Sequence, residues 1–276
     1  MPDVILAGMT IKVCIAGIGG KVGKALASAV VEASDLELVG GVSRRWAGRP
    51  LGDVVEAVAP VRGGVVQGDL VAALDASRCD VLVDYTSAAV VQEHVHLAIQ
   101  RGVHVVIGSS GLDAAQYEEI DRRAREAEVG VFAAGNFALT AVLLQKFAEM
   151  AARVLPTWEI VDYASPSKID APSGTARELA ARLGAIRAPE VRAIAETVGD
   201  PAARGATLAG MQVHSVRVPG YLLSVEVTFG QAGERLLIRH DGTDGSAPYV
   251  SGTLLAVRKV REWTGLRRGL DTLLEL

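Results

Sequence analysis

A cluster of glycines near the start of the chain has the spacing of a phosphate-binding turn. It reads Gly-Ile-Gly-Gly-Lys-Val-Gly over residues 17–23, between the apolar stretch 11–16 and a segment with helical spacing that runs to Ala33. Glycine permits a tight turn, and the unpaired N–H groups and positive dipole end at the start of a helix favour a pyrophosphate. The position between a strand and a helix is the context of a dinucleotide site. We predict that the cofactor pyrophosphate is held by Gly17, Ile18, Gly19, Gly20, Lys21 and Val22.

The end of the second apolar stretch, residues 36–43, bears on which nicotinamide cofactor binds. NAD sites place an Asp or Glu about 20 residues after the glycine turn, where it holds the ribose 2′-hydroxyl. Here Ser43 stands at that spacing and is followed by Arg44 and Arg45. No carboxylate repels a 2′-phosphate at this point, and two guanidinium groups can grip one. We therefore predict NADPH, with NADH as the second candidate. The alternative is that both arginines belong to a solvated loop.

The most distinctive stretch of the chain is Lys-Ile-Asp-Ala-Pro-Ser-Gly-Thr-Ala at residues 168–176. A segment with helical spacing begins at Ser173 or Thr175 and ends near Gly184, and a Ser or Thr is a common helix cap. In an unrelated chain, Lys168 would be an exposed loop lysine, and Ser173 or Thr175 would be no more than a cap.

Short apolar segments alternate with segments of helical spacing through the first half of the chain. Further strands are expected at 80–84, 104–107 and 129–133, with helices between them at 88–101 and 114–128. Buried strands that alternate with helices are typical of βαβ units. We predict an α/β protein with a Rossmann-type, doubly wound parallel sheet.

The pattern changes after about residue 135. A helix at 140–154 and a strand at 159–163 are followed, after an irregular excursion at 185–210, by three strands joined by short turns, at 214–218, 222–229 and 235–240. Consecutive strands with short turns indicate an antiparallel or mixed sheet. We predict a second, α+β domain, and a last helix near 252–263 that returns to the first domain.

Composition excludes several classes of protein. Half of the 276 residues are hydrophobic, only two are cysteines and the net charge is −4. These values argue against a disordered chain, a disulfide-stapled secreted domain and a nucleic-acid binder, and no apolar run is long enough for a membrane span. The five histidines show no metal-ligand spacing, so we expect no metal site. We expect a cytoplasmic protein without a nucleic-acid or membrane partner.

The first residues allow two interpretations. The stretch before Met9 lacks the basic region and long apolar core of a signal peptide. Residues 1–8 are either an extension from an upstream start codon or a loose arm, and either Met1 or Met9 can be the native start.

The stretch at 168–176 resembles the substrate-loop motif of the dihydrodipicolinate reductase family of bacterial lysine biosynthesis. Other segments agree in order: GIGGKVG at 17–23, DYT at 84–86, GSSGLD at 108–113, FAAGNF at 132–137 and AGER at 232–235. The resemblance covers essentially the whole chain from residue 11. It implies an NAD(P)H-dependent reductase, usually a homotetramer, that passes hydride to the C=N carbon of a cyclic imine or its dehydrated equivalent.

The resemblance also assigns domains and site residues. A dinucleotide-binding domain would comprise residues 1–135 plus about 247–276, and residues 136–246 would bind substrate and form the oligomer. Gly174 and Thr175 would bind a substrate carboxylate, and Lys168 would deliver a proton to the imine nitrogen. The nicotinamide half would be lined by Thr86, Gly108, Ser109, Ser110, Ala134, Asn136 and Phe137.

The chain departs from the family pattern on the substrate side. Where the family has a His-His pair ahead of its lysine, this chain has Ala164 and Ser165, and no arginine follows His240 in the segment where the family has one. These departures imply an altered substrate site, in which Ser165 and Ser173 bind substrate and Tyr163 donates a proton if its ring points inward. Two other hypotheses stay open: a catalytically weak NADP(H)-binding paralogue that acts as a sensor or interaction module, and a dehydrogenase that oxidises an amino acid.

Overall fold

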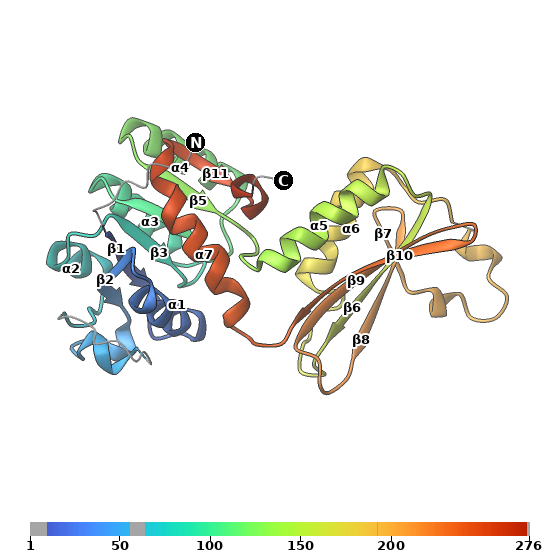
Figure 1. Ribbon diagram of the computed structural model, residues 1–276, viewed down its shortest axis with the longest axis horizontal. Helices are drawn as coiled ribbons and strands as arrows, with labels where there is room; N and C mark the ends of the chain where they lie inside the picture. Colours follow the sequence, from blue (N-terminus) through green and yellow to red (C-terminus); the bar gives the residue numbers. More distant parts are fainter. Residues whose placement is uncertain (1–9, 56–63, 192, 275–276) are drawn as a thin grey trace. The chain divides into compact units, whose positions relative to one another are not determined.

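The computed structural model describes residues 10–55, 64–191 and 193–274, which form two compact units (Figure 1). The first unit combines Met1–Ala138 with Ser246–Leu276, and the second is Leu139–Gly245. The alternative start Met9 lies outside the described residues. None of the helices within the described ranges is long and apolar enough to cross a membrane.

The first unit contains a six-stranded sheet with the order β11-β5-β4-β3-β1-β2, in which every neighbouring pair is parallel. The strands are β1 (Ile11–Ala16), β2 (Leu36–Val42), β3 (Val81–Asp84), β4 (His104–Ile107), β5 (Gly130–Ala133) and β11 (Gly265–Arg268). All residues of β3 and β5 are buried, as expected for strands covered on both faces. The predicted Rossmann-type parallel sheet is confirmed.

Helices form two layers against this sheet. The helices are α1 (Lys21–Glu32), α2 (Leu70–Ala76), α3 (Val91–Gln100), α4 (Ala114–Glu126) and α7 (Ala247–Lys259). Helix α1 packs beside α7, while α3 packs beside both α2 and α4. The chain thus returns from the second unit through α7, which completes one layer, and then adds β11 at the edge of the sheet (Figure 1).

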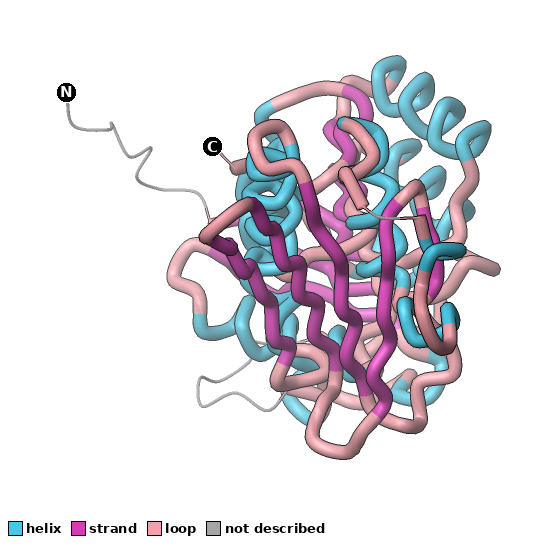
Figure 2. The backbone as a smooth tube through the Cα atoms, turned by 90° about the vertical axis from the view of Figure 1, so that its right-hand side faces the viewer, coloured by secondary structure: helices cyan, strands magenta, loops and turns pink. Residues whose placement is uncertain are grey.

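The second unit contains a five-stranded sheet with the order β10-β9-β6-β8-β7. The strands are β6 (Thr157–Ala164), β7 (Ala206–Leu208), β8 (Met211–Arg217), β9 (Leu223–Gln231) and β10 (Glu234–Gly242), and Figure 2 shows the long ones side by side. Strands β6 and β8 pair in parallel, whereas the other pairs are antiparallel. The predicted mixed sheet is therefore confirmed.

Two helices, α5 (Leu139–Ala152) and α6 (Gly174–Ile186), pack together and cover one face of this sheet. The alternation of buried residues along β6 shows which side chains meet them: Trp158, Ile160, Asp162 and Ala164 are buried and share a face. Trp158 packs on Phe229 of β9, with ring centroids 5.6 Å apart. The side chain of Asp162 therefore lies on the same face of the sheet as the apolar side chains of the core.

Candidate active site

The glycine turn after β1 is shaped for close approach of a ligand to its backbone. Gly17 has φ +85°, and a Cβ there would lie 2.3 Å from the carbonyl oxygen of Tyr85. A Cβ on Gly23 would lie 2.2 Å from the Gly17 oxygen, so α1 packs directly on the turn. Gly20 is the N-cap and offers no side chain, and within the described chain the N–H groups of Lys21 and Val22 have no hydrogen-bond partner. Open amides at a helix start form an anion site.

Two cations, Lys24 and Arg49, lie against the Trp46 ring beside this turn. A Cβ on Gly19 would lie 2.6 Å from Cδ1 of Trp46 and 2.7 Å from Oγ of Ser43. The Trp46 ring has Lys24 Nζ 4.8 Å and Arg49 Cζ 5.1 Å from its centroid, which are cation–π distances. Trp46 was not among the predicted site residues, because an isolated tryptophan after two arginines has no diagnostic spacing.

A cavity of about 480 Å³ opens next to the turn and brings several predicted residues together. Gly17, Ser43, Arg44 and Thr86 contribute to its lining, from the ends of β1, β2 and β3. Its volume is in the range of small-molecule sites. Asp69 also lines it, but its carboxylate caps α2 by accepting a hydrogen bond from Ala72 N at 2.9 Å.

The buried carboxylate of Asp84 organises the carboxyl end of β3. Its Oδ1 accepts hydrogen bonds from Thr86 Oγ1 at 2.7 Å, from Thr86 N at 3.0 Å and from Ser109 Oγ at 2.6 Å. Its Oδ2 lies 2.7 Å from Nδ1 of His94, which is another residue lining the cavity. Asp84 thus connects two predicted cofactor residues, Thr86 and Ser109, to a histidine that the sequence analysis had left without a role.

Burial and hydrogen bonding act in opposite directions on this carboxylate. Burial raises the pKa of Asp84, but the hydrogen bonds from His94, Ser109 and Thr86 outweigh burial and hold the pKa below its ordinary value. Asp84 is therefore an anion at neutral pH, and it fixes the imidazole of His94 at the wall of the cavity.

The remaining predicted cofactor residues follow β4 and β5 at the same edge of the sheet. Gly108 N donates to Asp84 O at 2.9 Å, and a Cβ on Gly108 would strike the Tyr85 ring. The Tyr85 hydroxyl lies 2.8 Å from Thr253 Oγ1, and burial raises the pKa of this phenol. The Phe137 ring lies 6.0 Å from that of Tyr85. Ser110 and Ala134 lie in these same connections, and Asn136 accepts a hydrogen bond from Ala138 N at 2.9 Å.

In the second unit, the start of α6 leaves two backbone donors open. Ser173 is the N-cap, with its side chain accepting a hydrogen bond from Ala176 N at 3.3 Å. In the described structure the N–H groups of Gly174 and Thr175 have no hydrogen-bond partner, and the Thr175 hydroxyl has none either. These three groups can bind a carboxylate at the positive end of a helix. The Ser173 hydroxyl, in contrast, is buried and already occupied by capping.

Lys168 lies a few residues before this helix and forms an ion pair within the motif. Its Nζ is 2.8 Å from Oδ1 of Asp170, and Arg177 lies 3.9 Å from the other oxygen of that carboxylate. The hydrogen bond from Lys168 lowers the pKa of Asp170, so the carboxylate stays charged beside the ammonium. The loop is closed by a hydrogen bond from Lys168 N to Ser165 O at 3.0 Å.

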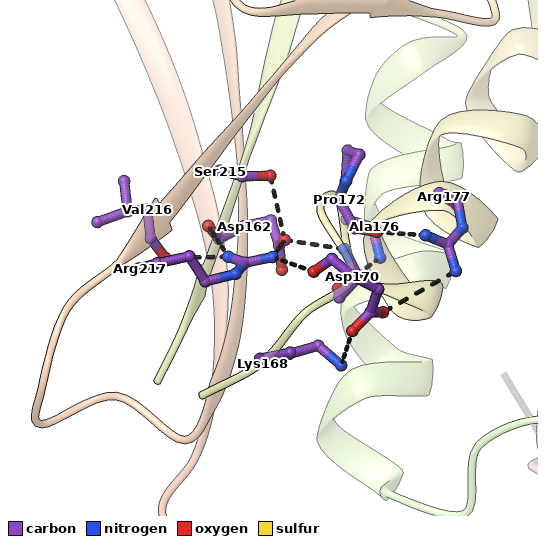
Figure 3. Close-up of polar contacts among 10 residues, drawn as sticks. Asp162, Lys168, Asp170, Pro172, Ala176, Arg177, Ser215, Val216 and Arg217 are labelled. Atoms are coloured by element: carbon purple, nitrogen blue, oxygen red, sulfur yellow. Dashed lines mark hydrogen bonds and ion pairs between the residues drawn. The ribbon is translucent and has the colours of Figure 1, made fainter. Parts of the chain in front are cut away.

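An ion pair of the buried Asp162 with the partly buried Arg217 joins β6 to β8 and contacts the same loop (Figure 3). Arg217 Nη2 is 2.7 Å from Asp162 Oδ2 and also donates to Asp170 O at 2.8 Å. Asp162 Oδ2 accepts a further hydrogen bond from Ser173 N at 2.8 Å. This pair was not predicted from the sequence, because no local pattern connects two residues that lie on different strands and 55 positions apart in the chain.

The structure separates the other predicted substrate-side residues. Tyr163 packs on Tyr221, with ring centroids 5.0 Å apart, and Arg239 lies over its ring at 4.8 Å. Because successive strand residues point to opposite faces, Tyr163 projects away from the face that carries Asp162 and Ala164. Ser165 lies in the loop, where its hydroxyl is 2.9 Å from that of Ser167.

His240 and Ala164 are both buried in the second unit. His240 Nδ1 lies 2.9 Å from Thr140 Oγ1, and burial lowers the pKa of the imidazole. Ala164 is fully buried and pairs in register with Arg217. The residue beside Ala164 on the neighbouring strand is thus a cation.

Comparison with known families matches nearly the whole chain. The model for dihydrodipicolinate reductase, N-terminus, matches residues 11–137, and that for dihydrodipicolinate reductase, C-terminus, matches residues 140–274. The chain belongs to the dihydrodipicolinate reductase family. It is therefore a reductase, an oxidoreductase that uses NAD(P)H.

Curated relatives of this family are similar over their full length. The chain is 39% identical over 267 residues to a 4-hydroxy-tetrahydrodipicolinate reductase of Moorella thermoacetica, which covers 96% of this chain and 98% of the relative. A protein of the same name from Nocardia farcinica is 38% identical over 276 residues, covering 97% and 100% of the two chains.

Solved structures support the same assignment. The dipicolinate-bound dihydrodipicolinate reductase of Paenisporosarcina sp. TG-14 is 32% identical and superposes with a TM-score of 0.86, covering 96% of this chain and all of the other. An amine dehydrogenase of Mycobacterium smegmatis has a TM-score of 0.64 at 16% identity, with 95% of each chain covered, and shares the fold alone.

Proposed function

We propose that the protein is an NADPH-dependent reductase of a cyclic imine dicarboxylate, which reduces 4-hydroxy-tetrahydrodipicolinate or its dehydrated form in the lysine and diaminopimelate pathway. The observation that carries this proposal is the juxtaposition, in residues 168–175, of an ammonium with open donors at a helix start. The names of the full-length relatives and the dipicolinate bound to one of them supply the substrate class.

The preference for NADPH rests on the groups around the glycine turn. Arg44 and Ser43 line the cavity. Arg45 follows Arg44 in a short 3₁₀ helix, Arg44–Trp46. Two carboxylates, Asp69 and Glu93, also line the cavity, and Asp69 is engaged as a helix cap. A guanidinium binds the 2′-phosphate of NADPH more strongly than the 2′-hydroxyl of NADH.

The residues at the carboxyl edge of the first sheet would hold the rest of the cofactor. The open amides of Lys21 and Val22 would bind the pyrophosphate, and Thr86 and Ser109, fixed by Asp84, would line the path toward the nicotinamide. NADPH bound there supplies the hydride.

On the substrate side, the amides of Gly174 and Thr175 and the Thr175 hydroxyl would bind one carboxylate. A hydride that reaches a carbon of a conjugated C=N system leaves negative charge on the nitrogen. The ammonium of Lys168 would stabilise that charge and donate a proton, and Asp170 would hold the ammonium in place until substrate binds. We assign this role to Lys168 rather than Tyr163, because the Tyr163 ring points away from this face of the sheet.

We also propose that the substrate site differs from the family pattern at Ala164 and Ser165. A small buried alanine and a serine would leave Lys168 as the proton donor at the imine, with Ser165 as an additional polar contact. We therefore expect weaker binding of a dicarboxylate, or a preference for a less anionic cyclic imine.

We propose a homotetramer. Its support is β10, the edge strand of the second sheet, where Leu236 and Leu237 are 44% and 51% exposed on opposite faces. An exposed edge strand with apolar side chains favours pairing with another subunit. The mass in solution, measured by light scattering, tests this proposal.

The function is tested by following NADPH oxidation after aspartate semialdehyde and pyruvate have been condensed by the synthase that makes the imine. We expect turnover with NADPH that exceeds turnover with NADH. Binding of NADPH without oxidation, on this substrate and on a panel of simple cyclic imines, would contradict a reductase and favour a nucleotide-binding paralogue.

A further inference from the structure

The ion pair of Asp162 and Arg217 joins two strands on the face that carries the substrate loop. In the parallel register of β6 and β8, Asp162 is paired with Ser215, and Ala164 with Arg217. Paired residues of neighbouring strands point to the same face. Asp162 and Ala164 are fully buried, so Arg217 reaches the buried face of the sheet from the adjacent strand.

This pair holds the motif loop at two points. Arg217 donates to the carbonyl oxygen of Asp170, and Asp162 accepts from the N–H of Ser173 (Figure 3). These two backbone groups lie on either side of the Ala171–Pro172 peptide. Asp170 is the residue that pairs with Lys168, and Ser173 is the N-cap of α6. The pair therefore contacts the loop both at the residue that binds the Lys168 ammonium and at the N-cap beside the open amides.

The pair leaves some of its own hydrogen-bonding atoms without partners, which is unfavourable for an interaction that serves stability alone. Asp162 Oδ1 and Arg217 Nε are buried and have no hydrogen-bond partner in the described chain. A buried ion pair loses hydration that its mutual attraction often fails to repay, and apolar residues of similar size are frequently as stable. Stability alone therefore does not account for the pair, whereas its two hydrogen bonds to the loop give it a structural role.

We propose that Arg217, held by Asp162, is a positioning residue for the substrate loop: it sets Lys168 and the start of α6 to receive one dicarboxylate. This inference rests on the proposed function of that loop. Arg217 acts through the loop and not as a ligand, because both of its Nη atoms are already bound to Asp162 and to backbone oxygens.

The first test compares Arg217→Ala with Arg204→Ala. Arg204 pairs with Glu159 on the same strand β6 but does not touch the motif loop, so it is a matched control. We expect Arg217→Ala to raise the dissociation constant of dipicolinate at least tenfold in calorimetric titration, to raise KM more than it lowers kcat, and to leave NADPH affinity within twofold. Arg217→Lys, which keeps the charge, should recover part of the loss, and Arg204→Ala should cause none.

A second variant separates positioning from stability. Arg217→Ala leaves the Asp162 carboxylate without its cation, so we expect it to lower the melting temperature. The double variant Asp162→Leu with Arg217→Met removes both charges of the pair, so we expect its melting temperature to lie close to that of the natural protein. Dipicolinate affinity should stay at least tenfold weaker. Recovery of affinity together with stability would overturn the proposal.

Amide hydrogen exchange of residues 165–176 provides a readout that needs no substrate. We expect at least tenfold faster exchange there in Arg217→Ala and in the double variant, and unchanged exchange in Arg204→Ala. Unchanged exchange and affinity in the Arg217 variants would overturn the proposal. If the natural protein neither reduces the imine nor binds dipicolinate, the proposed function fails, while faster exchange in the variants still supports the positioning role.

Discussion

Nδ1 of His94 lies 2.7 Å from Oδ2 of Asp84, and the same carboxylate receives hydrogen bonds from Thr86 and Ser109. One buried anion thereby fixes a side chain on α3, the second residue beyond β3 and the second residue beyond β4. In a parallel sheet these strand ends form the ligand-binding edge. The network thus connects the packing of the first unit to the geometry of the cavity beside the glycine turn.

Replacing Asp84 by Ala should weaken both the fold and cofactor binding. His94, Thr86 and Ser109 would lose their common acceptor, and a buried polar group left without its partner typically costs about 1–3 kcal/mol. We expect a lower melting temperature and an NADPH dissociation constant raised at least tenfold at 25 °C. Fluorescence titration and thermal unfolding measure the two effects, and Asp75→Ala, at an exposed ion pair with Arg101, is the control. Equal NADPH affinity in the Asp84 and Asp75 variants would contradict this role.

The same carboxylate should make stability depend on pH. The folded-state pKa of Asp84 is depressed, so its stabilising contribution is present above its unfolded pKa near 4 and is lost as the pH falls through the lower folded value. We expect the difference in unfolding free energy between the natural protein and Asp84→Asn to be constant from about pH 7 to pH 5 and to shrink below about pH 4. Urea unfolding at a series of pH values measures this difference. A difference in unfolding free energy that grows toward low pH would contradict a depressed folded-state pKa for Asp84.

Removing both arginines beside Ser43 should change the cofactor preference. Each hydrogen bond to a charged group is worth about 1.5–3 kcal/mol, so Arg44→Ala with Arg45→Ala should raise the NADPH dissociation constant by at least about tenfold and leave that of NADH nearly unchanged. The preference should also weaken with added salt, since exposed charges are screened. Equal losses for both cofactors would assign these arginines to general attraction rather than to the 2′-phosphate.

Replacing Lys168 by Ala should slow the chemical step. General acid catalysis contributes about 10²- to 10⁴-fold to a rate, so kcat should fall by that order while NADPH affinity stays the same. Lys146→Ala, at another lysine that pairs with a carboxylate, is the control. An unchanged kcat in Lys168→Ala would remove this lysine from the role of acid.

A histidine at position 164 should be poorly tolerated, whereas one at position 165 should be accepted. Ala164 is fully buried, and overpacking a core typically costs about 1–3 kcal/mol. Ser165 is half-buried in the loop, with room for a larger side chain toward solvent. We expect Ala164→His to lower the melting temperature by several degrees and Ser165→His to leave it nearly unchanged. The reverse order would show that the packing around these residues is not as described.

The fold was largely predictable because its strands are short and apolar and its helices are amphipathic. Expected strands at 11–16 and 104–107 coincide with β1 and β4. Strand β11 was missed, since two of its four residues are arginines and it pairs only at the edge of the sheet. Helix α2 was missed because seven residues are too few for a clear period.

The site was predictable where its chemistry is local. The glycine turn and the start of α6 each lie within one short segment of the sequence. The glycine spacing indicates an anion site at the turn, whereas the family resemblance at 168–176 assigned a carboxylate site to the start of α6. The pairs of Asp84 with His94 and of Asp162 with Arg217 join different elements, and the second spans 55 residues. No short-range pattern marks such a pair, because it exists only once the strands are in register.

The central claim is tested most directly by tracing the hydride. The protein is supplied with the synthase product and with NADPH that carries deuterium in both positions at C4 of the nicotinamide, and the reduced product is examined by mass spectrometry and NMR. The proposed function predicts one deuterium on a ring carbon of the product, with one equivalent of NADPH oxidised. NADPH oxidation without deuterium in the product, or no oxidation at all, would contradict it.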